Sequence, residues 1–313
     1  MINRALIRTK TVQLMYSWQS NPQPDSEQAL LQQRLSLQKT FELYHWLLLL
    51  SIEITKYAIK RIEIGLNKMR PTAEESNPNK RFINNKFYKQ LLENISLNDF
   101  AKENGIGWTD DDEEFIKEIY GVVINSDVYK EYMAAPEVTY EDDKMLWRKL
   151  YRKVLALSPA LENYLEDMDL YWNDDIETVL SFIEKTIKHF TPDSDATELL
   201  LPMYRDETDR DFAEELIKKA VEHQEEYRQM IVETAKNWEQ DRIATMDMVI
   251  MIVAIAEIVN FPAIPLSVSI NEYLEIAKVY STDKSKTFIN GVLDAIAERL
   301  KKSGKLLKVA IVK

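Results

Sequence analysis

Apolar residues recur every three or four positions along most of this 313-residue chain, whereas strict alternation of apolar and polar residues is scarce. The first spacing is that of one helix face, and the second is that of a strand. The chain has only 6 glycines, so the pattern favours an all-α fold. It predicts helices over residues 3–19, from about 25 to 69, and over 81–96, 113–134, 141–157, 159–189, 209–238, 241–260, 270–280 and 284–302.

Polar and proline-rich segments at 21–26, 70–80 and 190–202 separate these helices. The last one precedes the cleanest helical pattern, so we expect an N-terminal subdomain over 1–204 and a C-terminal subdomain over 205–313. The acidic runs "TDDDEE" and "YEDD" are typical of helix starts, where carboxylates favour the helix dipole. Ser269 and Glu272 have the spacing of a capping box, which predicts a helix that begins at 270.

One turn signal falls inside a helical pattern. Asn290-Gly291 is a strong hairpin dipeptide, yet apolar residues continue on both sides of it at helical spacing, from Phe288 to Leu300. We predict that the dipeptide lies inside a helix, at a cost of about 1 kcal/mol for the glycine.

The sequence shows no arrangement of residues that is typical of an active site. The chain has no cysteine, and its three histidines, His45, His189 and His223, are far apart. There is no glycine-rich phosphate loop. We therefore predict no catalytic residue, no metal site and no cofactor. Asp247 and Glu257 interrupt the most apolar stretch, 243–261, and leave nine uncharged residues between them, whereas a bilayer requires roughly 20. We expect a cytoplasmic protein.

Charge is distributed unevenly. The net charge is −12, but both ends are basic and the middle is strongly acidic. Arg4 and Arg8 lie four residues apart on one predicted helix face, with Lys10 on another, and two such arginines suit adjacent phosphates of a nucleic acid. A plain solvated helix terminus explains the same residues, so charge alone leaves both interpretations open.

The C-terminal third carries a more specific pattern. In order, it contains Trp238, Arg242-Ile243, Asp247, Glu257, Pro265, Asn271-Glu272, Ala277-Lys278 and "FINGVLD" from Phe288 to Asp294. Near the N-terminus, Tyr16-Ser17-Trp18 follows the basic residues. Together these residues resemble the NusB family of transcription antitermination factors.

The resemblance implies a NusB-type helical bundle of two subdomains that is not an enzyme. It implies binding of boxA-type single-stranded RNA together with the ribosomal protein NusE, within the RNA polymerase elongation complex, on ribosomal RNA operons. The RNA-binding residues that it implies are Arg4, Arg8, Lys10, Lys278, Lys284, Lys286 and Asn290. The partner-binding residues that it implies are Tyr16, Trp18 and Glu257. For Asn290, a buried polar anchor for the preceding loop is an equal alternative.

This chain departs from the family in size and in charge. An acidic helical insertion over about 21–204 has no counterpart in typical members; it would pack on the core, form a homodimer or bind another protein. Ala5, Leu6 and Ile7 stand where relatives often have arginines, and Met248 and Ile252 replace two more. The alternative function is therefore a helical interaction scaffold that has lost RNA binding. Some RNA cytosine methyltransferases carry a NusB-like domain, but such enzymes need a Rossmann-type domain and a catalytic cysteine, and this chain has neither a sheet pattern nor a cysteine.

Overall fold

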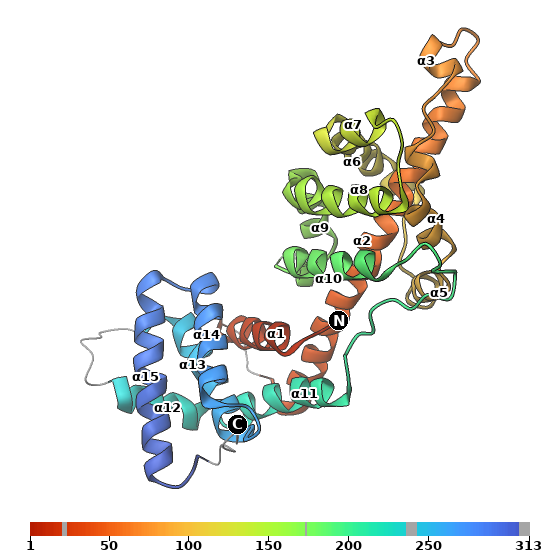
Figure 1. Cartoon of the computed structure of the whole chain (residues 1–313). Coiled ribbons are helices and arrows are strands. Elements are labelled where there is room, and N and C mark those ends of the chain that lie inside the picture. The colour runs from red at the N-terminus through yellow and green to blue at the C-terminus, as the bar shows by residue number, and fades with distance from the viewer. Residues whose placement is uncertain (21–23, 173, 236–242, 307–313) are drawn as a thin grey trace. The chain divides into compact units, whose positions relative to one another are not determined.

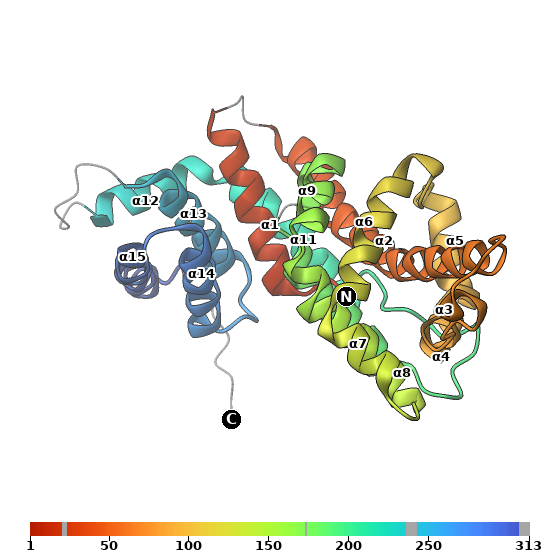
Figure 2. The same cartoon turned by 90° about the horizontal axis from the view of Figure 1, so that it is seen from above.

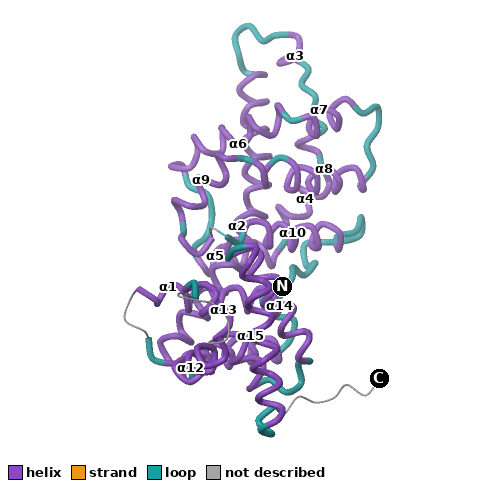
Figure 3. The backbone as a smooth tube through the Cα atoms, turned by 90° about the vertical axis from the view of Figure 1, so that its left-hand side faces the viewer, coloured by secondary structure: helices purple, strands orange, loops and turns teal. Residues whose placement is uncertain are grey.

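The computed structural model describes residues 1–20, 24–172, 174–235 and 243–306 (Figure 1). These residues contain no β-strand, and their only strand-like feature is an isolated parallel bridge between Ile2 and Tyr204 (Figure 3). The prediction of an all-α fold is confirmed. Two of the sequence motif positions, Trp238 and Arg242, and the basic tail after 306 lie outside the described residues.

The α-helices are α1 (Arg4–Ser17), α2 (Ser26–Leu66), α3 (Ala73–Ser76), α4 (Lys86–Glu93), α5 (Ile95–Asn104), α6 (Glu113–Asn125), α7 (Asp127–Ala134), α8 (Tyr140–Lys153), α9 (Pro159–Met168), α10 (Ile176–His189), α11 (Glu207–Glu222), α12 (Gln224–Ala235), α13 (Thr245–Asn260), α14 (Leu266–Tyr280) and α15 (Asp283–Lys302). Short 3-10 turns join several of them, including η4 (Leu155–Leu157) and η5 (Leu170–Trp172).

The chain forms two compact units. One contains Gln38–Met203 together with Met1, and the other contains Ile2–Leu37 and Tyr204–Lys313. The predicted division at 204/205 falls next to the junction at Met203, but residues 2–37 belong with the C-terminal helices. The assignment of the subdomains 1–204 and 205–313 stays a prediction.

In the unit that holds the C-terminal helices, α13 is the central element. Every side chain from Asp247 to Ile258 is buried. Helices α1, α11, α12, α14 and α15 all contact it, and Figure 2 shows α1 beside α11. A helix that is apolar on all sides is stable only when it is surrounded, which explains why α13 is covered by five others.

In the other unit, α2 is held from Gln38 onward by the polar tips of buried aromatic residues. The Tyr151 hydroxyl donates to the Leu47 carbonyl at 2.7 Å, and the Trp172 indole donates to the Lys39 carbonyl at 2.9 Å. The Tyr44 hydroxyl bonds to the Thr186 hydroxyl at 2.6 Å. Aromatic side chains bury large apolar areas while their polar ends find partners, so they join α8, η5 and α10 to α2.

Several helix boundaries differ from the prediction. The predicted helix over 113–134 breaks at Ser126, because this side chain accepts from the Tyr129 amide and caps α7. The stretch 209–235 is divided at His223 into α11 and α12. Residues 169–175 separate α9 from α10.

The predicted capping box at Ser269 and Glu272 is wrong. Helix α14 begins at Leu266, so Ser269 lies buried inside it, and the Glu272 carboxylate binds Arg8 instead of a backbone amide.

The prediction that the acidic runs lie at helix starts is confirmed. Thr109 with Asp112 and Thr139 with Asp142 form capping boxes before α6 and α8.

Within the described residues, no helix has both the length and the apolar character that crossing a membrane requires.

Candidate nucleic-acid interface

Arg8 of α1 forms a buried ion pair with Glu257 of α13. Its Nε donates to Glu257 Oε2 at 2.7 Å, and its Nη2 donates to Oε1 at 2.9 Å. The two side chains are only 4% and 0% exposed. A bidentate arginine–carboxylate pair fixes both distance and orientation. This contact therefore sets how α1 lies on α13.

Two residues of α14 complete the network. Arg8 Nη1 donates to Glu272 Oε2 at 3.1 Å, and the Tyr273 hydroxyl donates to Glu257 Oε2 at 3.0 Å. Burial would lower the pKa of Arg8, but the hydrogen bond and the charge of Glu257 outweigh it and raise the pKa. Burial, together with the charge of Glu257, raises the pKa of Tyr273 well above its usual value. The network therefore holds a protonated arginine and a neutral tyrosine on either side of Glu257.

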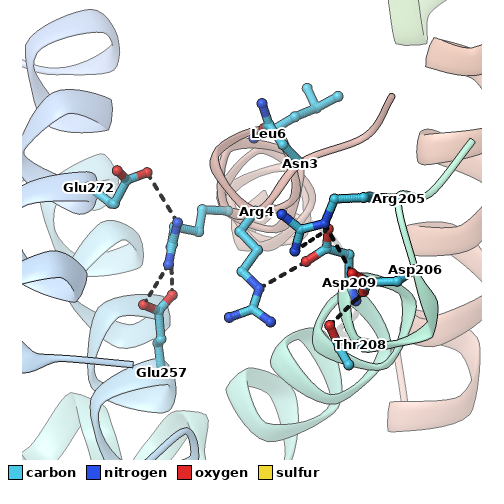
Figure 4. Close-up of polar contacts among 10 residues, drawn as sticks. Asn3, Arg4, Leu6, Arg205, Asp206, Thr208, Asp209, Glu257 and Glu272 are labelled. Carbon is cyan, nitrogen blue, oxygen red and sulfur yellow. Dashed lines mark hydrogen bonds and ion pairs between the residues drawn. The ribbon is translucent and has the colours of Figure 1, made fainter. Parts of the chain in front are cut away.

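Arg4 lies one turn before Arg8 and faces α11. Its Nε donates to Asp209 Oδ1 at 3.0 Å, and Arg205 also approaches Asp209, at 3.6 Å (Figure 4). The guanidinium groups of Arg4 and Arg8 lie 5.1 and 5.3 Å from the centre of the Phe212 ring. Both arginines thus combine an ion pair with a contact to one aromatic face. Arg4 stays partly exposed, whereas Arg8 does not.

The other predicted residues of α1 and its C-terminal end divide by exposure. Lys10 is buried. Trp18 is buried as well, and its indole Nε1 donates to Gln32 Oε1 at 2.9 Å. Tyr16 is exposed. The predicted partner residue Glu257 is buried in the Arg8 network, so of the three predicted partner-binding residues only Tyr16 presents its ring to solvent in this structure.

The junction between α14 and α15 presents the predicted lysines. Lys278 lies in the last turn of α14, and Lys284 and Lys286 lie in the first turns of α15. Lys278 and Lys284 are exposed, and Lys286 is partly exposed. Lys278 donates to Glu275 at 2.6 Å, and the hydrogen bond from Lys278 lowers the pKa of Glu275, with a smaller contribution from the charge of Lys286.

Buried hydroxyl and carboxylate groups hold this junction in place. The Ser281 hydroxyl donates to Asp247 Oδ1 at the start of α13 and lies 2.9 Å from the Ser285 hydroxyl. Gln13 Nε2 of α1 donates to the Tyr280 hydroxyl at 3.0 Å. The junction is therefore anchored to both α13 and α1, and its lysines project from a fixed backbone.

Asn290 and Gly291 lie in the interior of α15, as the apolar spacing predicts. Asn290 is partly exposed and its Nδ2 donates to Asp294 Oδ2 at 3.0 Å, one turn further along the helix. The alternative of a buried anchor for the preceding loop finds no support in this contact, because that loop is held by Asp247 and Ser285.

Sequence reasoning identified the arginines but missed their partners, Asp209 and Glu272. A signal was present in α1 itself. Helical geometry places Arg8 on the same face as the buried residues Thr11 and Met15, and a charged residue on a buried face requires a buried counter-charge. In the described parts of the chain, no three histidine, aspartate or glutamate side chains lie close enough to hold a metal ion.

Comparison with known proteins gives a consistent picture. The model of the NusB family matches residues 179–298, from α10 to α15. A protein named transcription antitermination protein NusB from Salinibacter ruber is 41% identical over 121 residues, which are 37% of this chain and 76% of the relative. Its namesake from Methylacidiphilum infernorum is 44% identical over 100 residues, 32% of this chain and 68% of the relative. That from Chloroherpeton thalassium is 42% identical over 99 residues, 32% of this chain and 47% of the relative. No solved structure matches the chain.

Proposed function

Because this chain belongs to the NusB family, we propose that it is an RNA-binding transcription antitermination factor. In this proposal it binds boxA-type single-stranded RNA together with NusE, as part of the RNA polymerase elongation complex, and supports processive transcription of ribosomal RNA operons. Its role is binding, and no catalytic residue is proposed.

The observation that carries the proposal is the exposed α14–α15 junction. Lys278, Lys284 and Lys286 lie within the region that the family model matches, and the buried Asp247 fixes the backbone from which they project. Cations held on a rigid frame suit phosphate contacts, which position a nucleic acid without reading its sequence. Asn290, two turns into α15, would add an amide that can read a base edge.

The N-terminal cations enter the proposal differently. Arg4 is partly exposed and is the residue of α1 that we propose for a phosphate contact. This contact would either replace the ion pair between Arg4 and Asp209 or form in addition to it. Arg8 and Lys10 are buried, so we propose that they help to hold α1 against the helices that it packs on, α11, α13 and α14. Tyr16 is the exposed aromatic residue that we propose for contact with NusE.

Binding of boxA RNA, measured with and without NusE over a series of salt concentrations, tests the proposal. We expect affinity to rise with NusE and to fall with salt. The triple variant K278A/K284A/K286A removes up to three phosphate contacts, so the slope of log affinity against log salt should become shallower by about 2. The control is K102A/K117A/K130A, which removes the same charge from exposed lysines of the other unit. An equal loss of affinity in both variants would contradict a localised interface.

A second candidate is a protein-interaction scaffold without RNA binding. The observation that favours it is the N-terminal basic helix, where Arg4 and Arg8 are bound by carboxylates and Lys10 is buried. Absence of boxA binding at low salt, both with and without NusE, would favour this candidate over the first.

A further inference from the structure

A cleft of about 640 Å³ lies in the unit that contains Gln38–Met203, between α8, η4, α9 and α10. In Figure 1 these elements lie together in the green part of the chain. Its apolar lining includes the buried side chains of Leu155, Leu161 and Leu180. This volume lies in the range of roughly 300–1,000 Å³ that is usual for ligand-binding pockets in proteins. Three of its four walls, α8, η4 and α9, lie before residue 179, where the match to the family model begins.

The rim of the cleft contains an exposed apolar residue. Leu157 lines the cleft and is 76% exposed. A molecule confined to the cleft would leave most of this side chain in water, whereas a helix laid across the rim would cover it. Helix-in-groove recognition uses apolar anchors at i, i+3 or i+4, and i+7, which suits a cleft that has leucines in its lining and a further leucine exposed at its edge.

The charges of the rim indicate which helix fits. Arg148 Nη2 donates to Glu184 Oε1 at 2.5 Å, and Lys188 also pairs with Glu184, so these charges are paired within the chain, although the buried Nε of Arg148 has no hydrogen-bond partner among the described residues. Glu162 and Glu177 line the cleft from the first turns of α9 and α10, and neither forms an ion pair with any described residue. Arg152 is the one rim cation outside the Glu184 pair, so the acids outnumber it.

We propose that this cleft docks a basic amphipathic helix of a partner protein. Leucine-type side chains of that helix fill the cleft and cover Leu157, and its lysines or arginines pair with Glu162 and Glu177. Opposite charges at a rim steer association and select among partners more than they add affinity, while the apolar contact supplies the affinity. The docking site is separate from the RNA interface proposed above and does not depend on it.

A designed peptide pair tests the proposal on the full chain. The probe is a fluorescein-labelled helix of about five turns, with leucine at the anchor spacing and lysine elsewhere. Its counterpart has glutamate at every lysine. We expect the lysine peptide to bind and the glutamate peptide not to bind. The variant L157A should weaken binding about tenfold, because it removes a covered apolar side chain. The variant E162Q/E177Q should weaken binding about threefold.

Matched controls separate docking from general attraction to an acidic protein. Leu199 is 73% exposed and Glu114 lies in the first turn of α6, and neither lines the cleft. L199A and E114Q should therefore leave peptide binding unchanged. The proposal fails if L157A and L199A have equal effects, if the glutamate peptide binds as tightly as the lysine peptide, or if neither peptide binds. Chemical-shift changes confined to α8, η4, α9 and α10 would place the peptide in the cleft, and changes elsewhere would overturn the assignment.

Discussion

The Arg8–Glu257 pair offers a quantitative test of how α1 is held. In the variant E257A, Arg8 loses two of its three hydrogen bonds and keeps only the one to Glu272, and the Tyr273 hydroxyl loses its acceptor. The guanidinium is 4% exposed and cannot be hydrated without movement of α1. Removing one partner of a buried ion pair costs about 3–5 kcal/mol, since the other charge stays buried and unpaired.

Removal of both charges should cost less than removal of one. The variant R8M/E257L replaces the pair by apolar side chains of similar size, and Glu272 is exposed enough to be hydrated in the absence of Arg8. Replacing a buried ion pair in this way is often neutral. The hydroxyl of Tyr273 stays without an acceptor, at a cost of about 1–3 kcal/mol. We therefore expect the double variant to be more stable than E257A by about 2 kcal/mol.

Native-state hydrogen exchange of the α13 amides is the assay, because it reports the unit that contains the pair rather than the whole chain. A loss of 3–5 kcal/mol accelerates the exchange that occurs through unfolding of this unit by roughly two to three and a half orders of magnitude. The control is R34A, which breaks the Arg34–Glu214 pair of the same unit; with side chains 53% and 23% exposed, that pair contributes at most about 1 kcal/mol. The reasoning is refuted if E257A costs no more than R34A, or if R8A and E257A add up in a double variant.

Three further predictions concern the unit that contains α2 from Gln38 onward. Burial lowers the pKa of His45 from 6.5 to about 4, so the unfolded chain takes up a proton at a higher pH than the folded one. The contribution of the neutral His45 to stability is complete above pH 6.5, and about 3 kcal/mol of it is lost by pH 4. Urea unfolding at several pH values should show this loss in the wild type and a smaller one in H45F. Y44F removes the hydroxyl that bonds to the Thr186 hydroxyl at 2.6 Å and accepts from the Leu201 amide at 3.4 Å. Because Thr186 also donates to the Phe182 carbonyl and the contact with Leu201 is long, a loss of only about 1 kcal/mol is expected by urea unfolding. N94A removes the cap of α5 at Leu97 and the bond to the Glu198 carbonyl at 2.7 Å, and should cost about 2 kcal/mol in thermal or urea unfolding; no change would show that water replaces both contacts.

The helical fold could be predicted because periodic apolar spacing records which face of each helix is buried. The same signal failed at helix breaks. Ser126 and His223 interrupt runs whose apolar spacing continues across the break, so only the local hydrogen bonds distinguish two helices from one. The start of α14 was misplaced for a related reason, since Ser269 and Glu272 have a capping spacing but the Glu272 carboxylate is used by Arg8.

The candidate site was harder to predict than the fold, because the type of a residue does not state its partner. Arg8 and Glu257 are 249 positions apart, and no local pattern joins them. An arginine that binds phosphate and an arginine that binds a buried carboxylate look the same in sequence. Their difference lies in the face of α1 on which each guanidinium falls, which becomes decisive only once the helices that cover that face are known.

The motif residues that identify the family therefore fall into two physically different groups in this chain, one mostly buried and one mostly exposed. Asp247, Glu257 and Glu272 are acids that hold the helices together, and Arg8 joins them from α1. Lys278, Lys284 and Lys286 make no such contact with α1 or α13 among the described residues, and they lie on the junction that the acids hold. Substitutions in the first group should change unfolding and RNA binding together. Substitutions in the second should change RNA binding and leave unfolding as it is, because exposed lysines contribute little to stability. A variant of the second group that unfolds more easily would show that the junction is part of the fold rather than a surface presented by it.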